Sequence, residues 1–235
     1  MKKFEYTPPE QPRELILKLG QKITDRIGHT VTAEDPEYYG LEALVTDEMA
    51  EVALKMKVRK PMTLAQAVKA TGKEEKVLEE LLQEMSNIGL LEYNWENPKH
   101  EKQYVLPMYV PGSAEFFNMK LDQIKEHPEV ASFFERMAFL PLQKVTPMVP
   151  PGGAGIGMHV IPVEKAIETE NESVSVEHIS HWLDKYDGKY AAGPCSCRYS
   201  RGVLGEGCAD DPEDWCIGVG DMADYLVETN KGHYI

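Results

Sequence analysis

Cysteine is absent from most of this chain. All four cysteines lie between positions 195 and 216, and none occurs elsewhere in the 235 residues. A chain of this length can bury a hydrophobic core without covalent cross-links, so structural disulfides are not expected to explain the cluster. Four thiols in one short segment instead indicate a site for a metal ion or a metal cluster.

Long apolar runs are also missing. The first residues, Met1 to Pro9, contain no apolar stretch typical of a signal peptide. No window approaches the roughly 18 apolar residues that a membrane helix needs. We therefore expect a cytoplasmic protein, in a compartment where thiols stay reduced and able to bind metals.

Basic residues are scarce relative to acidic ones. The chain has 25 Lys and Arg against 39 Asp and Glu, a formal net charge of −14. This charge disfavours nucleic acid and anionic membranes as partners, because their phosphate groups would be repelled. A local basic patch remains compatible with an acidic total, so the charge of each motif has to be weighed by itself.

Apolar residues recur at helical spacing through the first half of the chain. Arg13 to Ile27 predicts a short amphipathic helix in an N-terminal extension, residues 1–43. A separate module is predicted over residues 44–106. Its first helix ends at Lys57 with Asp47 as a candidate N-cap, and its second, Leu64 to Ala70, can be capped by Thr63.

The third predicted helix of this module runs from Glu74 to Ile88. Its apolar residues share one face, and Gly89 is a natural C-terminal cap before a strand at 90–94 and a return strand at 102–106. Three helices followed by a hairpin, joined by the phrase Met85-Ser-Asn-Ile-Gly-Leu-Leu-Glu-Tyr93, resemble the winged-helix fold. The apolar residues on this face are Val77, Leu78, Leu81, Leu82, Met85 and Ile88.

Many winged helices read DNA with the third helix. Here that helix offers Lys73 and Lys76 against five acidic side chains, a poor surface for phosphates. The acidic residues are Glu74, Glu75, Glu79, Glu80 and Glu84. We expect a protein-docking or structural module rather than a DNA reader.

Residues 107–151 predict a helical connector that leads to a C-terminal domain, residues 152–235. Ala114 to Glu126 and Glu129 to Leu140 have helical apolar spacing, and prolines between 147 and 151 favour extended backbone at the boundary. The overall fold class expected is α+β, mainly helical, with a winged-helix-like module before a small four-cysteine domain.

Two further motifs are interpreted as structural. Gly152 to Gly157 lacks the preceding strand and following helix of a dinucleotide-binding loop, so we interpret it as a turn. His178 and His181 share one face of an amphipathic helix, but two imidazoles alone do not make a metal site. No residue is proposed as a general acid, general base or nucleophile.

The spacing of the cysteines is Cys195-x-Cys197-x10-Cys208-x7-Cys216. It matches neither the paired C-x2-C knuckles of ordinary zinc sites nor the C-x2-C-x2-C run of bacterial ferredoxins. Four thiolates suit either Zn²⁺ or an iron–sulfur cluster, so ligand chemistry alone leaves both open.

The surroundings of the thiols favour a cluster. Glycines allow the backbone to fold closely around a bulky group and to direct amides at sulfur. Arg198 and Arg201 would offset the negative charge of a thiolate-ligated cluster, and Cys216 is expected just before a helix from Gly218 to Glu228. The glycines are Gly193, Gly202, Gly205, Gly207, Gly218 and Gly220.

The C-terminal segment resembles the Cys-x-Cys-Arg domain of anaerobic ferredoxin- and flavin-containing, pyridine nucleotide-linked oxidoreductases. The matching phrases are Pro194-Cys-Ser-Cys-Arg198, Gly207-Cys208 and Cys216-Ile-Gly-Val-Gly-Asp-Met-Ala223, with Gly155-Ile-Gly-Met-His-Val-Ile-Pro162 as a lead-in. The resemblance implies a [4Fe-4S] cluster bound by Cys195, Cys197, Cys208 and Cys216 and used for electron transfer.

The chain differs from that group because no ferredoxin-type motif and no dinucleotide-binding motif follow the cysteines. We therefore expect either the front part of a longer polypeptide or a protein that works with ferredoxin-type and flavin-containing subunits, and a homo-oligomer is compatible with both. The leading hypothesis is an iron–sulfur electron-transfer component of a flavin-linked oxidoreductase. The alternatives are a redox- or metal-sensing winged-helix regulator and a structural zinc-binding interaction domain.

Overall fold

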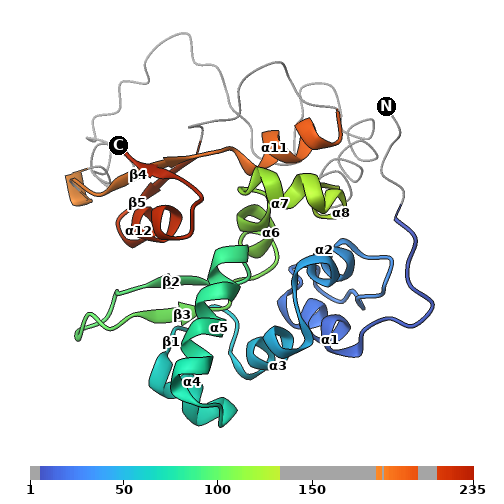
Figure 1. Cartoon of the computed structure of the whole chain (residues 1–235), viewed down its shortest axis with the longest axis horizontal. Coiled ribbons are helices and arrows are strands. Elements are labelled where there is room, and N and C mark those ends of the chain that lie inside the picture. The colour runs from blue at the N-terminus through green and yellow to red at the C-terminus, as the bar shows by residue number, and fades with distance from the viewer. Residues whose placement is uncertain (1–5, 133–183, 187, 206–215) are drawn as a thin grey trace, which may run out of the picture.

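The computed structural model describes residues 6–132, 184–186, 188–205 and 216–235 (Figure 1). Within these ranges the fold is mixed α+β: helices take up about half of the residues, beside two three-stranded antiparallel sheets. Among the described residues we find no helix with the length and apolar character needed to cross a bilayer.

The N-terminal part consists of two packed helices, α1 (Glu14–Ile23) and α2 (Pro36–Leu44). The helix predicted to reach Ile27 ends four residues earlier, because Thr24 and Arg26 turn aside to hydrogen-bond with the buried carboxylate of Glu37. Helix α2 was not predicted: it is buried on several sides, so its sequence lacks the single apolar stripe of an amphipathic helix.

Helix α3 (Asp47–Lys55) is followed by β1 (Met62–Thr63) and α4 (Leu64–Thr71). The N-cap of α3 is Thr46 rather than Asp47, because the Thr46 hydroxyl accepts a hydrogen bond from the Met49 amide. The predicted Thr63 cap is confirmed, and Gln66 completes a reciprocal capping box with it.

Helix α5 (Glu75–Ile88) ends as predicted at Gly89, which has a φ of +102°. Leu78, Leu82 and Met85 are buried, whereas Val77, predicted on the same face, is 52 % exposed. The hairpin strands β2 (Glu92–Asn94) and β3 (Gln103–Val105) follow, and β3 lies between β1 and β2.

The helix predicted from Ala114 to Glu126 is two helices, α6 (Ser113–Phe117) and α7 (Leu121–Glu126). The buried Asn118 interrupts it, because its side-chain amide donates to the carbonyls of Ala114 and Val130 and holds the chain in a turn. Helix α8 (Pro128–Ala131) then begins the second predicted helix of the connector.

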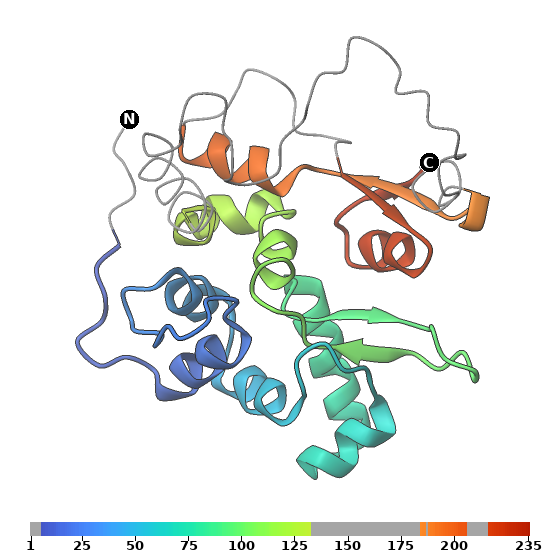
Figure 2. The same cartoon turned by 180° about the vertical axis from the view of Figure 1, so that it is seen from behind.

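The C-terminal part is a small sheet with two helices. Strand β4 (Tyr190–Gly193) leads into α11 (Ser196–Val203), and β5 (Cys216–Val219) leads into α12 (Asp221–Glu228). Strand β6 (His233–Tyr234) completes the order β5-β4-β6. Figures 1 and 2 show α12 between this sheet and the β2–β3 hairpin, and it packs against both.

The two parts share one hydrophobic core that runs from α1 to α12. The buried ring of Tyr225 lies edge-on to Tyr93, with 5.1 Å between centroids, and its hydroxyl donates to the Leu91 carbonyl at 2.8 Å. The buried Lys231 amino group donates to the carbonyls of Ser86 and Asn87, each at 2.9 Å, at the end of α5.

Several predicted features lie outside the described residues. They are Cys208, His178, His181, the turn from Gly152 to Gly157, the prolines at 147–151, and most of the helix from Glu129 to Leu140. The division into residues 1–43, 44–106, 107–151 and 152–235 stays a prediction.

Candidate cysteine site

Two of the predicted ligands, Cys195 and Cys197, lie at the start of α11. Strand β4 ends at Gly193, and Cys195 forms the N-cap of the helix. The carbonyl of Cys195 accepts hydrogen bonds from the amides of Arg198 and Tyr199 at 3.0 and 2.9 Å. This first turn therefore holds the backbone of both cysteines in place.

Cys216 is brought to the same place by the sheet. It is the first residue of β5 and pairs with Gly193 in the antiparallel register. Position 193 requires glycine, because a Cβ there would lie 2.4 Å from the Lys231 carbonyl oxygen and 2.9 Å from the Met119 side chain. The tight packing of β4 thus sets Cys216 beside the turn that carries Cys195.

The position of Cys216 differs from the prediction. The prediction placed Cys216 directly before a helix that begins at Gly218. In the structure Cys216 is instead the first residue of strand β5, and α12 begins only at Asp221. The helix that contacts Cys216 is α11, because the backbone amide of Ser196, in its first turn, donates a hydrogen bond to the Cys216 sulfur. A long-range strand pairing, rather than the local sequence, creates this contact.

The three described thiols influence one another. Burial raises the pKa of Cys216, and the neighbouring Cys195 raises it further, while the Ser196 amide acts in the opposite direction. Burial likewise raises the pKa of Cys197, again with a contribution from Cys195. All three thiols are free, so the described part of the site contains no disulfide.

A complete metal site is not visible in the described part of the chain. Within it, no group of three or more His, Cys, Asp or Glu side chains is arranged to hold a metal ion. The fourth predicted ligand, Cys208, belongs to a segment outside that part. The role of the four cysteines as ligands therefore stays a prediction, and their sulfur donors suit iron as well as zinc.

Arg198 and Arg201 lie on the same helix as two of the thiols. Both are partly buried, and Arg201 is one helical turn after Cys197. The structure therefore places two guanidinium groups on the element that starts at the site, as the sequence suggested. Their influence on a cluster stays a prediction.

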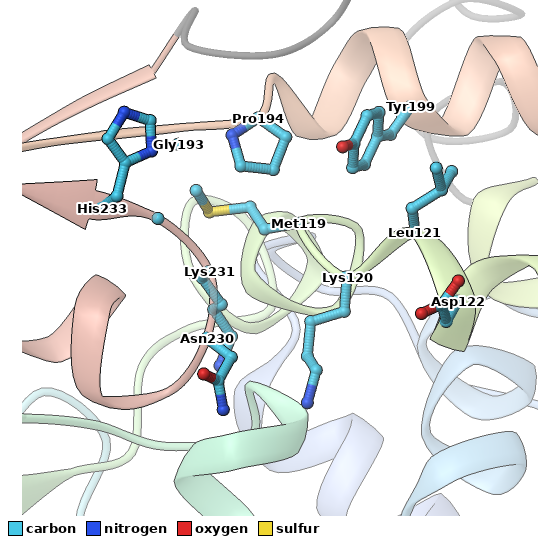
Figure 3. Close-up of a pocket in the computed structure, with 11 residues that line it drawn as sticks. Met119, Lys120, Leu121, Asp122, Gly193, Pro194, Tyr199, Asn230, Lys231 and His233 are labelled. Atoms are coloured by element: carbon cyan, nitrogen blue, oxygen red, sulfur yellow. The ribbon is translucent and has the colours of Figure 1, made fainter.

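Sequence reasoning did not find a pocket beside the cysteine turn. It has a volume of about 390 Å³ and is lined by residues 119–122, by Gly193, Pro194 and Tyr199, and by residues 230–233. In Figure 3, Pro194 and Tyr199 lie on one side, and Lys120 and Asn230 lie on the other. Because the three segments are far apart in the sequence, no local pattern could have indicated this pocket.

Comparison with known proteins identifies no relative. No protein-family model, no curated protein and no solved structure matches the chain. Any assignment of function therefore has to come from the residues of the site and from their arrangement.

Proposed function

We propose that the protein is an iron–sulfur electron-transfer component, or part, of a flavin-linked oxidoreductase of the cytoplasm. Its [4Fe-4S] cluster would be bound by Cys195, Cys197, Cys208 and Cys216. The observation that supports this proposal most directly is the meeting of thiols from two elements, α11 and β5, at the end of β4.

The electrostatics of the described thiols agree with a cationic centre. Burial penalises the thiolate forms of Cys197 and Cys216 and raises their pKa values, and the neighbouring Cys195 adds to this penalty. Bound iron removes that penalty, and a backbone amide such as that of Ser196 stabilises the ligand sulfur. A bound cluster would supply one-electron transfer, while this chain holds it, shields it and presents it to partners.

The helical part would serve as the assembly surface. The order α3, β1, α4, α5 and hairpin, with β3 between β1 and β2, supports a winged-helix-like module. Glu79, Glu80 and Glu84 are exposed on α5, which favours a protein partner over a duplex. We propose ferredoxin-type and flavin-containing domains or subunits as those partners.

Metal analysis tests the assignment. Anaerobically purified protein should be brown and contain about four iron atoms and about four acid-labile sulfides per chain. Cys197→Ser and Cys216→Ser should each release most of the iron and increase amide hydrogen exchange over 193–220. Gly202→Ala is the matched control on α11, because a Cβ there meets nothing within 4 Å.

The alternative outcomes are distinct. A folded, fully loaded preparation that contains zinc and no iron would exclude electron transfer and support a structural zinc domain. Full iron content in both serine variants would show that the wrong ligands have been named. Tight, salt-sensitive binding to duplex DNA would favour the regulator instead.

A further inference from the structure

The pocket beside the cysteine turn has the size of a small-molecule site. Its volume of about 390 Å³ lies within the range of about 300–1,000 Å³ typical of ligand pockets. Residues from the α6–α7 turn, from the end of β4 and the start of α11, and from the α12–β6 turn converge on it.

The wall of the pocket combines Lys120 with both polar and apolar side chains, and the exposed Asp122 carboxylate also lines it. Lys120 is partly buried, and within the described part of the chain its ammonium donates one hydrogen bond, to the Asn87 carbonyl at 3.3 Å, which leaves N–H donors for a ligand. Lys231 is different, since its amino group is buried and donates to two carbonyls, and burial lowers its pKa to about 6. Met119 and Tyr199 supply apolar surface in Figure 3.

We propose that this pocket binds a small organic acid, with its carboxylate beside Lys120 and its carbon skeleton between Met119 and Tyr199. A carboxylate suits a lysine that is held at a partly buried wall, because desolvation strengthens a charge-assisted hydrogen bond. A bare inorganic anion would leave the apolar side of the pocket unfilled. The local cation also stands out in a chain with a net charge of −14.

The pocket adjoins the backbone that positions the thiols. Pro194 lines it directly before Cys195, and the amide of Tyr199 donates to the Cys195 carbonyl at 2.9 Å. A ligand against these residues therefore contacts the turn that carries the first two cysteines. Resting on the proposed function, the acid is a substrate or effector whose binding changes the environment of the cluster.

The binding test compares matched probes on the full chain. Hexanoate should cause saturable ¹⁵N–¹H NMR shifts at Gly193, Tyr199 and Gly232, and the neutral isostere hexanamide should bind about tenfold more weakly. Inorganic phosphate should bind more weakly than hexanoate. Lys120→Gln should weaken hexanoate binding about tenfold and leave hexanamide binding unchanged, which shows that the pocket stays folded.

The control variant is Lys125→Gln, which removes an exposed lysine on α7 that does not line the pocket. It should leave both affinities unchanged. Equal affinity for acid and amide, equal binding of phosphate, or full hexanoate affinity in Lys120→Gln would overturn the proposal, as would shifts that map to another surface. No saturable shift up to millimolar hexanoate would also overturn it.

A second, spectroscopic measurement tests whether ligand binding in the pocket affects the cysteine site. In iron-loaded protein, hexanoate should change the electron paramagnetic resonance spectrum of the reduced cluster, and Lys120→Gln should abolish the change at the same concentration. An unchanged spectrum under saturating hexanoate would remove the link. Absence of iron would defeat the proposed function alone, because the NMR measurement of binding needs no cluster.

Discussion

At the residue scale, Arg26 organises the loop between α1 and α2. Its guanidinium donates to Asp35 at 2.8 Å and to both carboxylate oxygens of Glu37, at 2.8 and 2.5 Å. The Glu37 side chain is fully buried, and the Thr24 hydroxyl gives it another hydrogen bond. A charge in such a place is tolerated because its partners satisfy it, so this loop depends on ionised carboxylates.

Asp35 should make stability depend on pH in acid. Burial opposes its ionisation, but hydrogen bonds from Arg26, Thr32 and His29 outweigh that effect and lower the pKa of Asp35 from 3.8 to about 2. Because the pKa is lower in the folded chain, up to about 2 kcal/mol of stability is present above about pH 4 and lost as the pH falls toward 2.

Urea unfolding at a series of pH values between 7 and 2 would measure this effect. Asp35→Asn should lower the free energy of unfolding near neutral pH and flatten its decline in acid. Asp47→Asn is the control, since Asp47 pairs with Arg13 but its side chain is 63 % exposed. Identical acid profiles for wild type and Asp35→Asn would show that Asp35 is not the responsible group.

At the scale of single elements, the glycine caps of α4 and α5 allow the cost of a left-handed conformation to be separated from the cost of tight packing. Gly72 and Gly89 both end their helices in the left-handed region, with φ values of +73° and +102°. A Cβ at Gly72 would meet nothing within 4 Å, whereas one at Gly89 would lie 2.7 Å from the carbonyl carbon of Phe116. The two positions therefore share backbone strain and differ in packing.

Gly72→Ala should cost about 1 kcal/mol of unfolding free energy, the conformational penalty alone. Gly89→Ala should cost about 2–4 kcal/mol, because α6 must also move to relieve the overlap. Chemical unfolding of both variants measures the difference. If the two substitutions are equally destabilising, α6 is not packed on the end of α5 as described.

Prediction from sequence succeeded where structure is local. The α5 helix, its Gly89 cap and the Thr63 cap were predicted because apolar spacing and capping residues act over a few residues. It failed at α2 and at Asn118, where burial within the tertiary fold decides the conformation. The strand that begins at Cys216 was also missed. Its glycines give no strand signal in the sequence, and the strand is defined by its pairing with β4.

The cysteine site shows the same division. The four cysteines were predicted as ligands because they cluster between positions 195 and 216, and the resemblance ranked iron–sulfur above zinc. The contact between the Ser196 amide and Cys216 could not be predicted, because it needs the β4–β5 register. The pocket at Lys120 was missed for a similar reason, since its three segments meet only in the folded chain.

At the scale of the whole molecule, the C-terminal part is fastened to α5 and the hairpin by buried polar contacts. Tyr225 donates to the Leu91 carbonyl, and Lys231 caps the end of α5. At the rim, the Tyr93 hydroxyl donates to Glu228 at 2.7 Å. These bonds span long sequence separations, so we expect both parts to unfold together.

Tyr225→Phe tests this coupling. Loss of the hydroxyl leaves the Leu91 carbonyl without that buried partner and should lower the free energy of unfolding by about 1–2 kcal/mol. Amide exchange should then rise at both ends of the contact, in α12 and in β2. The measurement is chemical unfolding together with native-state hydrogen exchange.

Tyr234→Phe is the matched control, because the Tyr234 hydroxyl donates to Asp224 at an exposed position. Its effect should stay within about 0.5 kcal/mol. Faster exchange confined to α12 in Tyr225→Phe, with β2 unaffected, would contradict cooperative unfolding of the two parts.

The order β5-β4-β6 also sets the timing of assembly during translation. The central strand β4 is made first, and both of its neighbours, including His233 and Tyr234, are made later. Cys195 and Cys216 can come together once β5 has been made, because β5 pairs directly with β4 and β6 joins the opposite edge of β4. Machinery that delivers iron and sulfide to this site could therefore act as soon as β5 has paired with β4, before β6 has joined the sheet.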